Sequence, residues 1–366
     1  MSKPKIGLGS QIAKAMVFDA NATPAKLRGV GMPLDTNTRW IRELIRDGEF
    51  EGYITIRTFR ELVNLASEGG GRVQDTQEIV TNIINDHKIK VYSNPNQNPL
   101  IPFSSGEVGD YISLALDLDL DVFITKTSEM FERFLLENCD LRPKLKVFIL
   151  TPRMFGKLKR SQHVNTNFKS GWGYSFRNIE SLEELESLHQ FETDILPQDT
   201  ALTEDRLKDW WQSYRAGIKA LFLEKQLMGV FSLWPLSKET VQSLREKVAE
   251  GIFEESSLNV LPYREGQKCK YWYIGGFYLH ESLRGQGLSE SLARKLLLRS
   301  LSFWLAGGES CFQPILDQGV ELLAIPVNPF AKSILIKYGF YEEKGASHDG
   351  FPLYAKTIRT IGDLIL

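Results

Sequence analysis

Two periods of apolar residues alternate along the first part of the chain, one typical of strands and one typical of helices. Short apolar runs predict buried strands at 15–20, 89–93, 121–125 and 146–152. Helical spacing predicts helices at 38–48, 75–87 and 108–120, and residues 53–67 begin as a strand and become helical. Because strands alternate with helices, we expect βαβ units and a parallel sheet in an α/β/α arrangement.

The second part of the chain has a different order of elements. Helical patterns cover residues 181–195 and 205–215, and two apolar runs at 218–224 and 227–234 predict a hairpin. Further elements follow: a helix with Val241, Leu244, Val248 and Ile252 on one side, a strand at 270–279, a helix at 289–305, a strand at 320–327 and a helix at 328–340. We expect a mixed sheet flanked by helices.

A basic stretch with little periodicity lies between the two parts. Residues 153–173 contain no acidic residue and five basic ones: Arg153, Lys157, Lys159, Arg160 and Lys169. We interpret it as a linker whose charge is available for phosphates, and the alternative that we favour is a solvated connector. The domains expected are 1–155 and 175–366, with a basic linker at 156–174.

Composition narrows the class of protein. The chain has 366 residues, 42% hydrophobic and 25% charged, with a net charge of −2, which is typical of a globular protein with two domains. An anionic partner must therefore be met by a local patch of charge. Three separated cysteines, Cys139, Cys269 and Cys311, fit a reducing compartment, and no apolar run suggests a signal peptide or a membrane span. We expect a cytoplasmic protein.

The stretch HESLRGQGLSESL, residues 280–292, follows a predicted strand and opens a predicted helix. A helix N-terminus presents backbone N–H groups and the positive end of the helix dipole. Gly285 and Gly287 let the backbone approach a ligand closely, and Arg284 adds a cation. The stretch predicts a cradle for a pyrophosphate, and the alternative is a tight turn into a helix.

Residues from about 175 to 360 resemble the GNAT acetyltransferase superfamily. Its phosphate-binding signature corresponds to Arg284, Gly287 and Ser289, with serine where the family has glycine or alanine. A second family pattern, after the next strand, corresponds to four residues in the expected order: Asn328, Ala331, Gly339 and Phe340.

The resemblance implies acetyl-CoA as the cofactor and an amine as the acceptor. The pyrophosphate would lie on the amides of Gln286, Gly287, Leu288 and Ser289, and the pantetheine arm along the strand ending at Leu279. The strands carrying Leu279 and Val327 would splay apart to admit it. The amine would attack the thioester directly, without a covalent enzyme intermediate.

The proton chemistry has several candidates. Where the family often has a tyrosine as the acid, this chain has Leu335, and Tyr338 lies one turn further on. His280 is a candidate base, and Glu192, Asp194 and Glu224 are other candidates. The alternatives are a packing tyrosine, an exposed histidine and solvated carboxylates.

Carboxylates in the first part suggest a metal site. Asp19 follows a predicted strand, Glu61 lies on a helix and Asp110 lies near the start of another. If they converge at the carboxyl end of a parallel sheet, they would hold Mg²⁺ or Mn²⁺. Each one alone has a structural interpretation: a helix N-cap for Asp110 and a solvated helix face for Glu61.

Residues 14–155 resemble a PIN-like ribonuclease domain through the segments around Asp19, Glu61 and Asp110 and the closing KVFILTPRMF. Thr127 stands where the family has a fourth aspartate, and Glu129 lies nearby as a further metal ligand. The resemblance implies a metal-dependent nuclease acting on RNA or tRNA.

Three hypotheses follow. The first is an acetyl-CoA-dependent N-acetyltransferase with an appended PIN-like domain, in a toxin-like or translation-linked role. The second is a metal-dependent ribonuclease with a regulatory acetyl-CoA-binding domain. The third is a PIN-like domain that serves only to recruit a substrate or partner. Both families often form dimers, so a homodimer is also an expectation.

Overall fold

The computed structural model describes residues 3–20, 31–68, 73–93, 106–138, 141, 144–165, 172–196, 202–250, 258–264, 267–284, 293, 295–297, 299–301, 304, 313–314, 318–327, 329–343, 352–360 and 363. The chain divides into two compact units, which we call unit 1 (Met1–Gly173) and unit 2 (Tyr174–Leu366). In the described ranges, no helix is long and apolar enough to cross a membrane.

Unit 1 is built on a parallel five-stranded sheet with the order β3-β2-β1-β4-β5. Its strands are β1 (Lys5–Leu8), β2 (Glu51–Thr55), β3 (Ile89–Tyr92), β4 (Val122–Ile124) and β5 (Phe148–Leu150). Its helices are α1 (Ser10–Val17), α2 (Thr36–Arg46), α3 (Ile56–Glu68), α4 (Val73–Asp86), α5 (Gly106–Leu118), α6 (Ser128–Glu137) and α7 (Pro152–Asn165). The direction of the connections reverses between β1 and β4, as in doubly wound sheets.

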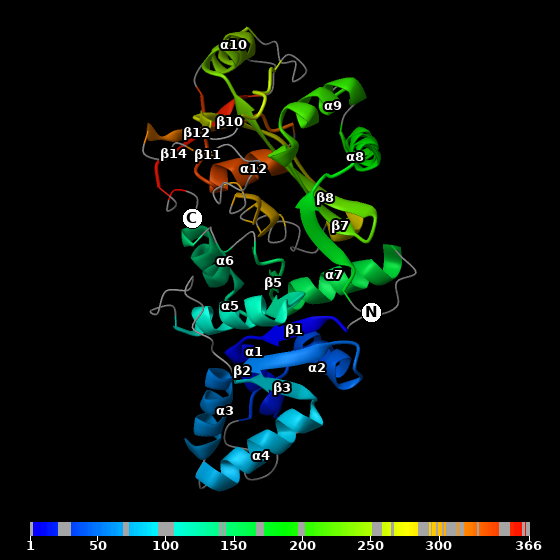
Figure 1. Ribbon diagram of the computed structural model, residues 1–366, viewed down its shortest axis with the longest axis vertical. Coiled ribbons are helices and arrows are strands. Elements are labelled where there is room, and N and C mark those ends of the chain that lie inside the picture. Colours follow the sequence, from blue (N-terminus) through cyan, green and yellow to red (C-terminus); the bar gives the residue numbers. More distant parts are fainter. Residues whose placement is uncertain are drawn as a thin grey trace. The chain divides into compact units, whose positions relative to one another are not determined.

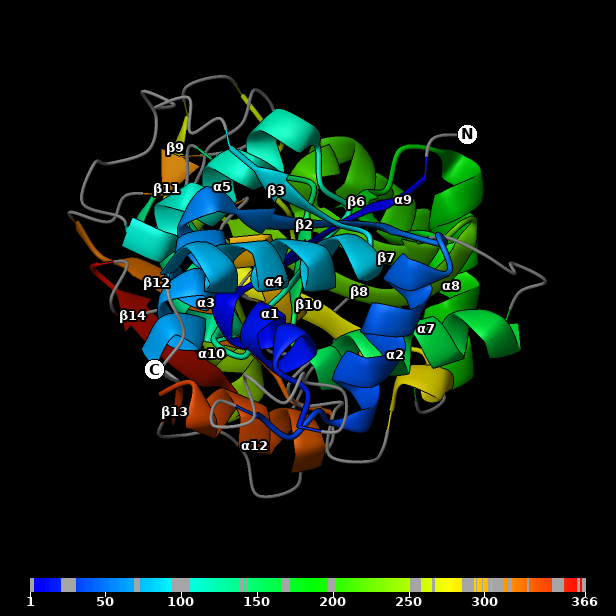
Figure 2. The ribbon, with the colours of Figure 1, turned by 90° about the horizontal axis from the view of Figure 1, so that it is seen from below.

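Helices cover both faces of this sheet. Figure 2 shows α1 to α4 together in front of the strands, and Figure 1 shows α5 and α6 on the opposite side. The strands are therefore apolar on both faces, which explains the short continuous apolar runs of the sequence. Tyr111, Phe123 and Phe131 pack together under α5 and α6, with ring centroids 4.6 to 6.2 Å apart.

Three expectations for unit 1 were wrong. Residues 15–20 are not a strand, because α1 covers Ser10–Val17 and the first strand is β1. Ile12, Ala15 and Met16 are all buried at helical spacing, so the apolar run belongs to the inner side of a helix. Helix α6 was not expected after the fourth strand.

The third error concerns the basic stretch, whose first half is a helix rather than a linker. Helix α7 buries Phe155 and Leu158. Lys159 is 0% exposed, and its amine lies 3.7 Å from a Glu49 carboxylate oxygen and over the Phe50 ring. This lysine contributes to the packing of unit 1, so the basic run is not a uniformly solvated surface for phosphates.

Unit 2 is built on a mixed seven-stranded sheet with the order β13-β14-β12-β10-β8-β7-β6. All neighbours in it are antiparallel except β10 and β12. Its strands are β6 (Tyr174–Asn178), β7 (Ile218–Leu223), β8 (Gln226–Leu236), β10 (Tyr271–Leu279), β12 (Val320–Ala324), β13 (Tyr341–Glu342) and β14 (Tyr354–Ile358). Strands β9 (Lys268–Cys269) and β11 (Gln313–Pro314) form a separate short pair.

The helices of unit 2 are α8 (Leu182–Ile195), α9 (Glu204–Ser213), α10 (Lys238–Ala249) and α12 (Pro329–Lys337), with 3-10 turns at η4 (Arg215–Gly217) and η6 (Glu281–Leu283). The predicted helices at 181–195 and 205–215, the hairpin and the strand at 270–279 are confirmed. Strands β6, β13 and β14 were not expected.

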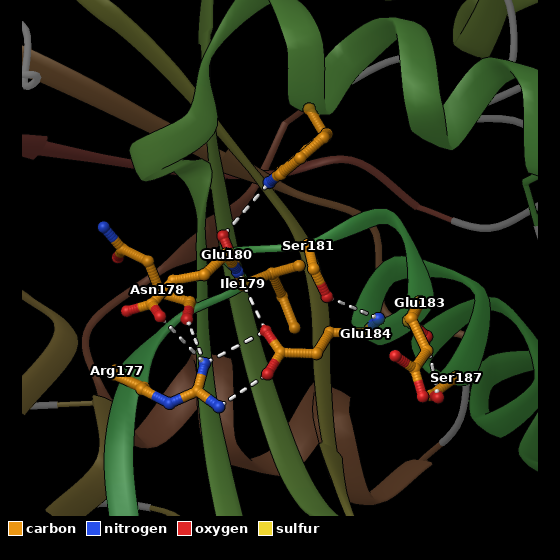
Figure 3. A network of polar contacts seen from close by, with 9 residues as sticks. Arg177, Asn178, Ile179, Glu180, Ser181, Glu183, Glu184 and Ser187 are labelled. Carbon is orange, nitrogen blue, oxygen red and sulfur yellow. Dashed lines mark hydrogen bonds and ion pairs between the residues drawn. The ribbon is translucent and has the colours of Figure 1, made fainter. Parts of the chain in front are cut away.

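A polar network fixes the start of α8 (Figure 3). Ser181 accepts a hydrogen bond from the Glu184 N–H at 3.2 Å, which caps the helix. Arg177 donates to both oxygens of the Glu184 carboxylate, at 2.6 and 3.0 Å, and Glu180 N–H donates to it at 2.9 Å. The hydrogen bonds with Arg177 lower the pKa of Glu184. The strand β6 and the helix α8 are therefore tied together at this corner.

Candidate functional site

The centre of the unit 2 sheet is a parallel pair that stays together along only part of its length. Residues Tyr271 to Ile274 of β10 pair with Glu321 to Ala324 of β12. Among the described residues this ladder ends there, although β10 continues beside β8 as far as Leu279. The ladder ends where β12 itself ends, at Ala324, while β10 continues for five more residues. The splaying expected around Leu279 and Val327 stays a prediction.

A bulge lies in β10 where its ladder with β12 ends. The register between β10 and β8 shifts between Ile274 and Gly276. A Cβ atom on Gly275 would lie 2.8 Å from the Trp234 indole nitrogen, and one on Gly276 would lie 2.8 Å from a Tyr278 ring carbon. Side chains therefore pack directly against the backbone of the bulge, which only glycine allows.

The carboxylate of Glu192 lies over this bulge. Its Oε1 would be 3.4 Å from a Cβ on Gly276. Glu192 is 7% exposed, and burial raises its pKa from 4.5 to about 8. Within the described part of the chain, no cation or hydrogen-bond donor contacts this carboxylate. A buried carboxyl with such a pKa is suited to accept a proton near neutral pH.

A small cavity, with a volume of about 10 Å³, lies beside Glu192 between α8, α9 and the sheet. Ile218 of β7, Ser232 and Trp234 of β8 and Gly275 of β10 line it from the sheet side. Because side chains alternate along a strand, these residues share one face of the sheet. Sequence patterns did not predict Ser232, Trp234, Gly275 or Tyr278 as site residues, although the glycine pair inside an aromatic strand signals a bulge.

His280 lies just beyond β10 and caps the short turn η6. Its Nδ1 accepts a hydrogen bond from the Ser282 N–H at 3.3 Å and lies 2.9 Å from the Ser282 hydroxyl. The Phe191 ring stacks on the imidazole at 6.4 Å between centroids. Burial lowers the pKa of His280; the charge of Glu281 opposes this effect and that of Arg284 adds to it.

Tyr338 is buried at the end of α12. Lys356 donates a hydrogen bond to its carbonyl oxygen at 2.5 Å. Gly339 follows with a φ of +73°, and the Phe340 N–H donates to the Leu335 carbonyl at 3.0 Å, so the glycine ends the helix. The Gly-Phe pair therefore has the expected helix-closing geometry, whereas the acid role of Tyr338 stays a prediction.

Two of the predicted cofactor-binding residues lie in the described ranges. Arg284 donates from Nε to the Leu279 carbonyl at 2.6 Å, which holds the arginine at the carboxyl end of β10. The other predicted cofactor-binding residues lie outside the described residues: Gly285, Gln286, Gly287, Leu288, Ser289 and Asn328.

The four predicted metal ligands of unit 1 do not form one cluster. Asp19 follows the end of α1, is 3% exposed, and pairs with Arg42 at 3.0 Å. Since α1 runs back from the carboxyl edge of the sheet for about 12 Å, its end lies toward the opposite edge. Asp19 was therefore misplaced together with the strand at 15–20.

Glu61 and Asp110 lie on helices that begin at the carboxyl edge, and each has a cation beside it. Glu61 pairs with Lys14 at 3.0 Å, and Asp110 pairs with Arg57 at 2.7 Å. Burial raises the pKa of Asp110, while the charge of Arg57 opposes this and that of Glu107 adds to it.

Glu107, which was not a predicted site residue, accepts a hydrogen bond from the Ser10 N–H at 3.3 Å. Glu129 is exposed in the first turn of α6, after Thr127. The described residues include no group of three or more histidine, cysteine or carboxylate side chains arranged to hold a metal ion.

No family model matches this chain, and no curated protein matches it. Several solved structures are similar to about half of it. The loading GNATL domain of CurA from Lyngbya majuscula is 15% identical over 51% of this chain and 98% of its own, with a TM-score of 0.35.

Naa50 of Arabidopsis thaliana, in complex with a bisubstrate analogue of CoA, is 14% identical over 50% of this chain and 98% of its own, with a TM-score of 0.31. NAA60 of Arabidopsis thaliana, in complex with acetyl-CoA, is 18% identical over 51% of this chain and 99% of its own, with a TM-score of 0.30. Likenesses of this strength decide neither activity nor ligand, so the functional assignment depends on the geometry of unit 2.

Proposed function

We propose that unit 2 is a GNAT-like domain and that the protein is an acetyl-CoA-dependent N-acetyltransferase acting in the cytoplasm. The observation that supports the proposal is the end of the β10–β12 ladder at a glycine bulge that lies beside a buried carboxyl. The expected sequence signatures flank this bulge, with Arg284 after β10 and Gly339 after α12.

In this proposal, acetyl-CoA lies along the part of β10 that extends beyond its ladder with β12. The amides of pantetheine pair with the edge of β10 beyond Ile274, and the pyrophosphate meets the amides of residues 286–289 with Arg284 beside them. Acetyl-CoA supplies the reactive thioester. The residues of unit 2 align the thioester with the acceptor amine and accept the proton that the amine loses.

Glu192 is the base in this proposal. It takes a proton from the amine, whose nitrogen attacks the thioester carbonyl, and the C–S bond then breaks. A backbone N–H of the bulge stabilises the oxyanion that forms. CoA leaves as a thiolate, which is a good leaving group because thiols have a pKa of about 8.5. His280 and Tyr338 stay predictions as proton donors to it.

Calorimetric titration with acetyl-CoA tests the proposal. We expect the wild type to bind, and Gly287→Glu and Arg284→Gln to weaken binding by about tenfold or more, because the first adds a negative charge to the cradle and the second removes a cation. The matched control is Arg264→Gln, which changes an exposed arginine of the same unit. Absence of binding by the wild type, or equal binding by Gly287→Glu, would remove the proposal.

We propose that unit 1 is a PIN-like module that recruits a partner or substrate rather than a metal nuclease. The observation in favour is that Lys14 and Arg57 occupy the positions beside Glu61 and Asp110. The test is cleavage of single-stranded RNA with Mn²⁺, for which we expect no increase over a metal-free sample. Mn²⁺-dependent cleavage that Asp110→Asn abolishes and Glu137→Gln keeps would restore the nuclease hypothesis.

A further inference from the structure

The small cavity beside Glu192 has apolar walls on most sides. Its volume of about 10 Å³ is close to the smallest that can hold one water molecule. Leu188, Leu207 and Ile218 supply the apolar walls, and each is at most 2% exposed. A wholly apolar cavity stays dry, so the polar groups that face this one decide whether it binds water.

Three polar side chains of the lining meet at the glycine bulge. A Cβ atom on Gly276 would lie 3.2 Å from the Ser232 hydroxyl oxygen and 3.4 Å from Glu192 Oε1. A Cβ atom on Gly275 would lie 3.1 Å from the same hydroxyl and 2.8 Å from the Trp234 indole nitrogen. The carboxylate, the hydroxyl and the indole N–H therefore converge on the space that the two glycines leave open.

These three groups are buried without a hydrogen bond to the protein. Glu192, Ser232 and Trp234 are 7%, 5% and 1% exposed. Within the described part of the chain, no protein group forms a hydrogen bond with the carboxylate, the hydroxyl or the indole N–H. Buried polar groups nearly always have a partner in the protein or an ordered water. One water has the donors and acceptors to meet all three.

We propose that the cavity is a binding site for one water molecule, which is held by Glu192, Ser232 and Trp234 and hydrates the buried base. The water donates a hydrogen bond to the Glu192 carboxylate and accepts one from the Trp234 indole, and the Ser232 hydroxyl fixes its position. Ser232 is thus a positioning residue that acts on the base through the water. Its effect on acetyl transfer rests on the proposed acetyltransferase function.

This water makes it easier for the buried carboxyl to ionise. Among the described residues of α8, α9, β7, β8 and β10, no charged side chain shifts the pKa of Glu192, because burial is the only cause of the shift. A hydrogen bond donated to a carboxylate stabilises its charged form and lowers its pKa. Losing the water should therefore raise the pKa of Glu192 by about one pH unit, which corresponds to one hydrogen bond to a charged group.

The first variant is Ser232→Ala, and Ser175→Ala, in β6 of the same sheet and outside the cavity lining, is its matched control. Infrared spectroscopy of the full chain without acetyl-CoA follows the protonated Glu192 carboxyl, whose band is assigned by its loss in Glu192→Gln. We expect the pKa of Glu192 to rise by about one pH unit in Ser232→Ala and to stay unchanged in Ser175→Ala. An equal pKa in the wild type and in Ser232→Ala would overturn the inference.

The second variant, Gly276→Ala, places a methyl group where the water would lie. This Cβ would also lie 2.8 Å from a Tyr278 ring carbon, so that ring has to move aside. We expect a high-resolution crystal structure of the wild type to show one water between Glu192 and Ser232, and that of Gly276→Ala to show none. A wild-type structure without this water would contradict the proposal.

Steady-state kinetics show whether the water matters for acetyl transfer. The pH at which kcat/KM rises follows the pKa of the base in the free enzyme. In Ser232→Ala we expect this part of the profile to move upward by about one pH unit, so that activity falls by about tenfold near neutral pH and recovers as the pH rises. A loss of equal size at every pH would show that Ser232 has only a structural role.

The infrared and binding measurements separate the two levels of the proposal. If acetyl-CoA does not bind while the pKa of Glu192 rises in Ser232→Ala, the acetyltransferase function fails and the water site stands. If acetyl transfer proceeds while this pKa is the same in Ser232→Ala, only the water site fails.

Discussion

The two units use buried carboxylates in opposite ways. In unit 1, Asp19 is nearly as buried as any residue of the core and has Arg42 against it at 3.0 Å. In unit 2, Glu192 is similarly buried, and burial alone raises its pKa to about 8. One carboxylate is paired with a cation of the fold, while the other has no cation against it among the described residues.

The presence or absence of a cation beside a buried carboxylate therefore distinguishes a structural carboxylate from one that can exchange a proton, whereas residue type does not. A paired carboxylate at the end of a helix joins two elements, as Asp19 joins the end of α1 to α2. A carboxylate that faces a pocket and a strand bulge, without a cation among the described residues, keeps its capacity to exchange a proton. Burial alone would have ranked both residues as candidate site residues.

The largest expected effect comes from Glu192→Gln, which keeps the shape of the side chain and removes its basicity. We expect kcat/KM for acetyl transfer to fall by about 10² to 10⁴, the usual contribution of a general base. Steady-state kinetics with acetyl-CoA and a primary amine acceptor measures it. The dissociation constant for acetyl-CoA should stay within about twofold, and a variant with full activity would show that Glu192 is only a packing residue.

Breaking the buried pair of unit 1 should affect stability rather than acetyl transfer. Arg42→Met leaves Asp19 buried without its cation, and we expect a loss of about 3 kcal/mol in the free energy of unfolding of unit 1. Urea denaturation measures it. The double variant Arg42→Met with Asp19→Leu should recover much of the loss, and an unchanged midpoint in the single variant would contradict the buried-pair interpretation.

The pH dependence of stability should also distinguish the two carboxylates. Between pH 4.5 and about 8, Glu192 is protonated in the native state and ionised in the unfolded state, so the native state binds more protons. Stability of unit 2 therefore falls as pH rises through this window, by at most about 1.4 kcal/mol per pH unit. Denaturation from pH 5 to pH 8 measures the slope.

Glu192→Gln removes the titrating group and should flatten this slope. Glu184→Gln is the control, because the pKa of Glu184 is lowered by Arg177 and its contribution is lost only in acid. An equal slope in the wild type and in Glu192→Gln would contradict the raised pKa.

The smallest effect is expected for the exposed pairs at the carboxyl edge of unit 1. The Arg57 and Asp110 side chains are partly exposed, so Arg57→Gln should cost less than about 1 kcal/mol. Thermal unfolding measures it, with Arg133→Gln on α6 as a control pair of similar exposure. A loss as large as that of Arg42→Met would show that the two kinds of pair do not differ.

Periodicity predicted most of the elements because strands and helices in this chain bury distinct patterns. It failed where an apolar run was short: residues 15–17 fit a strand and a helix equally well, and the neighbours Ile12 and Ala13 decide in favour of α1. That single error misplaced Asp19 and, with it, the predicted metal site. Helix α7 was not predicted because the basic residues around Phe155 and Leu158 interrupt the apolar periodicity of its buried side.

The site in unit 2 was predictable only in part. Glu192 was one of several acids on a helix rich in glutamate, and its burial depends on the sheet residues beneath it, which no local pattern contains. The glycine pair at 275–276 is visible in the sequence. That it forms a bulge at the site could be recognised only from the pairing of β10, which continues with β8 after its ladder with β12 has ended at Ile274.

The outer strand β13 has a consequence for how this protein behaves at high concentration. It is only two residues long, Tyr341 and Glu342, and Glu342 forms an ion pair with Lys332 of α12. Sheet edges that are short and charged offer few main-chain groups to a second molecule, which protects against edge-to-edge aggregation. Substituting Glu342 and Glu343 by valine would extend an apolar edge, and we expect such a protein to precipitate where the wild type stays in solution.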